Sequence, residues 1–124
     1  MTTARRTIAL LLLLTAGAAG ATEEVPFITT PDRVTRTMLE IAGVGPRDHV
    51  IDLGSGDGRI VITAARRHSA RGLGVEIDPT LVARSREHAR QAGVADRAEF
   101  REQDLFKTDL APATVVTMYL LPDV

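Results

Sequence analysis

The sequence predicts an α/β fold with a doubly wound parallel sheet. Apolar segments that suit strands alternate along the chain with segments of helical periodicity, which is typical of a parallel sheet with helical crossovers. The first strand leads into a glycine-rich loop at residues 54–58, and a helix follows at once. The length of 124 residues suits a single domain, which we place over residues 22–124.

Residues 1–21 have the pattern of a secretory signal peptide. Arg5 and Arg6 form a positive start, an apolar run covers 8–14, and small residues occupy 19–21. The apolar run is shorter than the roughly 20 residues of a membrane span, although an uncleaved anchor remains an alternative. We therefore expect an exported or periplasmic protein with no stable membrane span after signal removal. A start at Val25 would instead give a cytoplasmic protein.

Helices and strands are expected in regular order from residue 30. Thr30 is a good N-cap for a first helix that begins at Pro31 and ends at Gly43. The last strand is continuously apolar, so we expect both of its faces to be covered, and the fold to be truncated after it. The remaining segments are predicted as strands at 49–53, 73–77, 98–103 and 114–121 and helices at 60–68 and 79–92.

The loop after the first strand has the spacing of a ligand-binding turn. Asp52, Gly54, Gly56 and Gly58 stand at alternate positions. Glycine permits positive φ and close approach of the backbone to a ligand, and amides of the next helix point into the same space. A dinucleotide fingerprint would need glycine at position 59, which is Arg, and a P-loop would need Gly-Lys-Ser/Thr. The pattern instead resembles motif I of class I methyltransferases that use S-adenosylmethionine.

Two acids at the ends of the first two strands suit this cofactor. Asp52 can hold its cationic amino acid end, or it can tie the loop together through backbone amides. Glu76 can accept hydrogen bonds from both ribose hydroxyls, as acids at this place do in dinucleotide folds. Asp78 precedes a proline at the start of the next helix, and we assign it to capping that helix.

The last two strands supply the remaining candidate site residues. Asp104 can accept from the adenine amine while Leu105 or Phe106 lies against the ring, although Asp after a strand is also a common turn residue. Tyr119 ends the fourth strand, where an aromatic face suits a transferring methyl of cationic character. We therefore predict Tyr119 as catalytic, with a core strand running into a proline turn as the alternative.

Residues 25–124 resemble the seven-strand, Rossmann-like class I methyltransferases. The closer likeness is to the lysine methyltransferases of mitochondrial carriers and of the ATP synthase c-subunit, with their bacterial relatives. It is carried by Val25–Phe27, Asp52–Val61 and Tyr119–Pro122. The resemblance implies S-adenosylmethionine as cofactor, with Tyr119 near the transfer site. The cofactor-binding residues that we predict are Asp52, Gly54, Ser55, Gly56, Gly58, Glu76 and Asp104.

We thus expect an S-adenosylmethionine-dependent methyltransferase that acts on a protein lysine amine. A small-molecule methyltransferase and a catalytically inactive, nucleoside-binding fragment are the alternatives. The net charge of −1 argues against a nucleic-acid binder that relies on a basic face. Because cysteine is absent, thiolate nucleophiles and cysteine zinc sites are excluded. The histidines His49, His68 and His88 lack metal-ligand spacing, so no metal is expected.

Overall fold

The structure, a computed structural model, describes residues 28–120. The signal peptide that we expect at residues 1–21 lies outside this range. So do two of the segments that carry the family resemblance, Val25–Phe27 and Leu121–Pro122. The elements are α1 (Asp32–Ile41), β1 (His49–Leu53), α2 (Arg59–His68), β2 (Arg71–Glu76), α3 (Pro79–Gln91), β3 (Ala98–Glu102), a short 3₁₀ turn η1 (Leu105–Lys107) and β4 (Val115–Met118).

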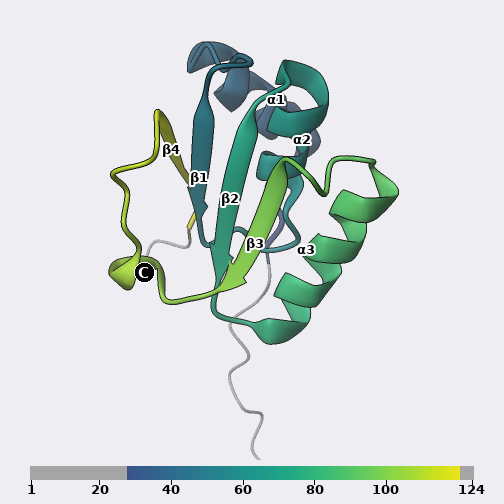
Figure 1. Cartoon of the computed structure of the whole chain (residues 1–124), viewed down its shortest axis with the longest axis vertical. Coiled ribbons are helices and arrows are strands. Elements are labelled where there is room, and N and C mark those ends of the chain that lie inside the picture. The colour runs from purple at the N-terminus through teal and green to yellow at the C-terminus, as the bar shows by residue number, and fades with distance from the viewer. Residues whose placement is uncertain (1–27, 121–124) are drawn as a thin grey trace, which may run out of the picture.

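The strands form a parallel sheet in the order β3-β2-β1-β4 (Figure 1). The chain therefore moves from β1 to one side for β2 and β3, and returns to the other side for β4. The strand order therefore reverses between β1 and β4. Such a reversal is where open α/β sheets bind their ligands. The predicted α/β fold with a parallel sheet is confirmed.

The three α-helices cover one face of the sheet (Figure 1). Val50 of β1 packs there with Leu39 of α1 and Ile60 of α2, and all three are buried. Phe100 of β3 packs in the same way with Val82 of α3. Alternate residues of a strand point to opposite faces, so one parity of each strand is committed to the helices.

The opposite parity builds a second apolar cluster on the other face. Ile51 and Val75 are fully buried there, although no α-helix of the described chain covers them. The segment between β3 and β4 crosses this face instead, and its Leu105 and Ala113 pack on the cluster (Figure 1). The cluster holds the carboxyl ends of β1 and β2 in place, and the loops that follow them form the candidate site.

Four expectations about the elements were wrong. The fourth strand is shorter than 114–121, and its faces are not both covered, since Val116 and Met118 are 41% and 60% exposed. The reason is that Val116 and Met118 pair in register with Ile51 and Leu53 of β1, so they point to the face opposite the α-helices, where no described segment covers them. Thr30 does not cap α1, because the N-cap is Pro31 and no side-chain cap bond forms. The second strand begins at Arg71 and ends at Glu76 instead of covering 73–77.

Candidate active site

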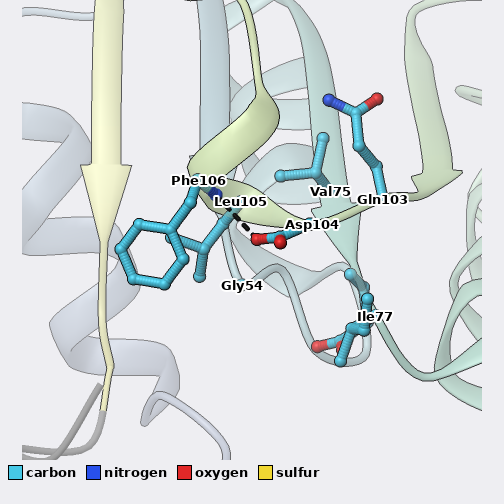
Figure 2. Close-up of a pocket in the computed structure, with 8 residues that line it drawn as sticks. Gly54, Val75, Ile77, Gln103, Asp104, Leu105 and Phe106 are labelled. Atoms are coloured by element: carbon cyan, nitrogen blue, oxygen red, sulfur yellow. Dashed lines mark hydrogen bonds between the residues drawn. The ribbon is translucent and has the colours of Figure 1, made fainter.

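A cavity of about 330 Å³ lies at the carboxyl ends of the strands. Its volume falls in the range of roughly 300–1,000 Å³ that is usual for small-molecule sites. Three loops contribute to it, namely those after β1, β2 and β3 (Figure 2). The lining residues are Gly54, Val75, Glu76, Ile77, Gln103, Asp104, Leu105 and Phe106. Three predicted cofactor-binding residues therefore meet in one cavity: Gly54, Glu76 and Asp104.

The glycine loop is packed tightly against β2, β3 and α3. The N–H groups of Gly54 and Ser55 both donate to the Val75 carbonyl, at 3.0 and 2.9 Å. Gly58 has a φ of +86°, and a Cβ there would lie 2.8 Å from Cζ of Phe100. Only glycine satisfies both conditions at this position. Because α2 begins directly after Gly58, its first-turn amides open toward the loop.

Glu76 at the end of β2 is held by two backbone amides. Its Oε1 accepts from the Gly56 N–H at 3.1 Å, and its Oε2 accepts from the Asp78 N–H at 3.0 Å. A carboxylate has about four lone-pair sites, so each oxygen retains capacity to accept a further hydrogen bond. This fixed acceptor pair at the cavity wall suits a vicinal diol such as ribose.

Asp78 caps α3, as expected. Its Oδ1 accepts from the Thr80 N–H at 2.8 Å, and Pro79 occupies the first helical position. Asp78 therefore has a structural role at the helix start and does not line the cavity, whereas Glu76 does.

Asp104 and two apolar residues form the end of the cavity nearest η1. Asp104 Oδ1 accepts from the Phe106 N–H at 2.9 Å, the bond drawn in Figure 2. Leu105 lines the cavity, and the side chains of Ile77 and Phe106 beside it are 67% and 78% exposed. Exposed apolar groups on two sides of a carboxylate suit a flat heterocycle with an amine. The predicted adenine contact of Asp104 stays a prediction.

Asp52 does not line the cavity. Its side chain is 1% exposed, and Oδ1 accepts from the Thr117 hydroxyl of β4 at 2.8 Å. Burial raises the pKa of Asp52 to about 7; the Thr117 bond acts to lower it, and the charge of Glu76 to raise it. A contact of Asp52 with the amino acid end of a cofactor thus stays a prediction.

Ser55 and Tyr119 also lie outside the cavity lining. Ser55 is buried against β2, where a Cβ on Gly74 would lie 2.6 Å from its Oγ. Tyr119 follows β4 and is 43% exposed. The next residue, Leu120, lies so close to the loop that a Cβ on Gly54 would be 2.5 Å from its Cδ2. The segment after β4 therefore reaches the glycine loop, and the catalytic role of Tyr119 stays a prediction.

Sequence reasoning missed an ion pair that ties the glycine loop to the start of α1. Arg59 donates from Nη2 to Asp57 Oδ2 at 2.7 Å and from Nη1 to the Thr30 carbonyl at 2.9 Å. Partial burial acts to raise the pKa of Asp57, but the hydrogen bonds and charge of Arg59 lower it below its ordinary value. The sequence carried a signal for this pair, an acid and an arginine on either side of Gly58.

Two negative findings apply to residues 28–120. No group of three or more His, Asp or Glu side chains is placed to hold a metal ion in this range. None of the helices described there has the length and apolar character needed to cross a membrane.

The fold and the site together define a class of protein. A parallel sheet with a glycine loop after β1, and acids at the ends of β2 and β3 that line one cavity, belongs to the nucleoside-binding α/β domains. Within this class, the ANTKMT methyltransferase domain matches residues 52–124. The chain belongs to this methyltransferase family.

Curated relatives agree with this assignment. A protein-lysine N-methyltransferase of Saccharolobus islandicus is 45% identical over 101 residues, which are 81% of this chain and 63% of that protein. The adenine nucleotide translocase lysine N-methyltransferase of Mus musculus is 34% identical, over 82% of this chain and 44% of that protein. The chain thus spans about half to two thirds of these relatives. The predicted resemblance to carrier and c-subunit lysine methyltransferases is confirmed.

A solved structure gives the same fold. The crystal structure of an RNA methyltransferase from Salinibacter ruber, in complex with S-adenosyl-L-homocysteine, is 59% identical and aligns with a TM-score of 0.76. The alignment covers 77% of this chain and 63% of that one. The Rossmann-like fold expected from the sequence is therefore confirmed.

Proposed function

We propose that this protein is an S-adenosylmethionine-dependent methyltransferase whose acceptor is a lysine amine of a protein. The observation that carries the proposal is the cavity itself, where Glu76 is fixed by the amides of Gly56 and Asp78 beside the glycine loop. Relatives named as protein-lysine N-methyltransferases support the acceptor, and the complex of the Salinibacter ruber protein with S-adenosylhomocysteine supports the cofactor.

The residues that line the cavity fit the parts of this cofactor. Glu76 would accept from the ribose hydroxyls through its two fixed oxygens. Ile77 and Phe106 would lie against the adenine ring, and Asp104 would accept from its amine. The Asp57 amide and the first-turn amides of α2 would meet the amino acid carboxylate, because the other amides of the glycine loop already donate to Val75, Glu76 and Ser55. When bound, S-adenosylmethionine supplies an activated methyl group on a positively charged sulfur.

The chain's own contribution to transfer is positioning. An amine nitrogen must lie in line with the bond that breaks, and a fixed geometry supplies much of the rate enhancement. Leu120 packs on Gly54, so the segment after β4 borders the site and brings Tyr119 near it. The ring of Tyr119 would offer the transferring methyl an aromatic face, which favours positive charge.

Different acceptors have to be distinguished by experiment. The Salinibacter ruber neighbour is named an RNA methyltransferase, so RNA is the second candidate acceptor. A small molecule is the third, and an inactive, nucleoside-binding chain would transfer no methyl group at all. Export to the periplasm is a separate proposal, which rests on the pattern of residues 1–21 alone. Fractionation of cells that express the full gene product, with mass spectrometry of its N-terminus, tests the export.

Two measurements test the proposed activity. S-adenosylhomocysteine should bind in calorimetry and raise the melting temperature of the full gene product, whereas NAD should do neither, because ligands stabilise only the state that binds them. Equal stabilisation by NAD would contradict the proposal that S-adenosylmethionine is the cofactor. The protein should then be incubated with a cell extract and S-adenosylmethionine that carries a labelled methyl group. We expect the labelled macromolecules to be digested by protease and not by ribonuclease. The opposite sensitivity would establish RNA as the acceptor.

A further inference from the structure

Two consecutive carbonyls of the glycine loop accept hydrogen bonds from one face of α3. The Ser85 hydroxyl donates to the Gly56 carbonyl at 3.0 Å. The Nδ1 of His88 lies 3.1 Å from the Asp57 carbonyl, and because a carbonyl only accepts, Nδ1 must carry the hydrogen. Residues three apart on a helix are neighbours on its surface, so the two donors form a matched pair.

The helix that carries this pair is firmly docked. Ser85 is fully buried. Arg86 next to it donates from Nε and Nη2 to the Phe100 carbonyl of β3, at 3.2 and 2.8 Å. Gly58 allows the loop to come this close, since a Cβ there would lie 3.0 Å from the Cβ of Ser85. The two donors therefore have a fixed position relative to the loop.

Holding these carbonyls also fixes the direction of the next amides. In a planar trans peptide the C=O and the following N–H point in opposite directions. With its carbonyl toward α3, Gly56 leaves the N–H of Asp57 pointing away from α3. In the same way the N–H of Gly58 points away from α3, and it donates to the Ser55 carbonyl at 2.9 Å. The carbonyl oxygens of Gly56 and Asp57 thus lie on the side of the loop that faces α3, and the N–H of Asp57 lies on the opposite side.

We propose that Ser85 and His88 are positioning residues for cofactor binding, because they keep two carbonyl oxygens of the glycine loop away from the carboxylate of the cofactor. This inference rests on the proposed function, since S-adenosylmethionine carries such a carboxylate at its amino acid end. Successive backbone N–H groups form a concavity that binds anions, whereas carbonyl oxygens repel them. If the peptide groups after Gly56 and Asp57 could rotate, their carbonyl oxygens could face the carboxylate, and the loop would bind it more weakly.

The test compares two ligands that differ in the amino acid end. S-adenosylhomocysteine has the carboxylate, and 5′-methylthioadenosine has the same nucleoside without it. Ser85→Ala and His88→Leu should each weaken binding of S-adenosylhomocysteine about 3- to 10-fold, the effect of one ordinary hydrogen bond. Binding of methylthioadenosine should stay within about 2-fold of wild type, a change well under one hydrogen bond. Calorimetry on the full gene product gives both constants.

Two further variants separate positioning from general stability. In His88→Asn, the amide nitrogen replaces the Nδ1 donor, so this variant should recover most of the affinity that His88→Leu loses. Val82→Ala removes a buried contact of α3 without touching the loop, and it should lower the melting temperature while leaving the ratio of the two affinities unchanged.

The outcomes distinguish this inference from the proposed function. If the wild-type protein binds S-adenosylhomocysteine but His88→Leu weakens both ligands equally, or neither, the positioning role is overturned and the proposed function stands. Equal behaviour of His88→Asn and His88→Leu would also overturn it. If the wild-type protein binds neither ligand, the proposed function fails, and this inference with it.

Discussion

The buried carboxyl of Asp52 should make the stability of the protein depend on pH, in a direction opposite to that of most acids. Its pKa is raised to about 7 from an ordinary value of 3.8, chiefly by burial. Below pH 3.8 the group is protonated in both folded and unfolded chains, and no penalty exists. As the pH rises through this window, the unfolded chain ionises first, so the folded state loses stability until pH 7. The full penalty is about 4 kcal/mol, from about 1.4 kcal/mol per pKa unit.

Asp52→Asn removes this ionisation while its side-chain oxygen still accepts from the Thr117 hydroxyl. We expect the free energy of unfolding of the variant, relative to wild type, to increase by up to about 4 kcal/mol between pH 4 and pH 8. Urea denaturation at several pH values measures this difference. Thr117→Val serves as a second perturbation, because it removes a bond that lowers the pKa and so should move the transition to higher pH. Parallel pH curves for wild type and Asp52→Asn would refute the reasoning.

Three other predictions concern the site and the sheet edge. Glu76→Ala should weaken S-adenosylhomocysteine binding by about 1.5–3 kcal/mol in calorimetry, the value of charge-assisted hydrogen bonds, while the exposed control Glu102→Ala leaves it unchanged. Gly56→Val should abolish binding in the same assay, since φ is +55° there and a β-branched side chain resists that conformation; normal binding would contradict this. The 124-residue chain should self-associate through the exposed side chains of β4, and Met118→Lys should reduce its mass in light scattering; unchanged association would exclude this edge.

The parts of the fold set by local sequence were predictable. The bounds of β1 agree with the expected strand, and the helix after the glycine loop was predicted to within a residue at its start, because apolar periodicity and glycine spacing act over short distances. It was likewise predictable that Gly54, Glu76 and Asp104 lie close together, since each stands at the carboxyl end of a strand in a parallel sheet.

The parts set by tertiary contact were not predictable. The extent of β4 depends on what covers it, and an apolar run alone does not reveal that. The burial of Asp52 depends on Thr117, which lies opposite it only because β4 pairs with β1. Ser85 and His88 contact the loop from a helix that follows it by about thirty positions, and neither stands in a recognisable motif.

The contacts of the glycine loop link cofactor binding to the folding of the whole domain. The loop is held by a carbonyl of β2 at Val75, by side chains of α3 and by the carboxylate of Glu76. Arg59, which follows the loop, donates a hydrogen bond to the carbonyl of Thr30, just before α1. The loop can therefore reach its binding conformation only when β2, α3 and the start of α1 have docked. A ligand that selects this conformation must stabilise all of these elements together, so its binding energy appears as stability of the domain.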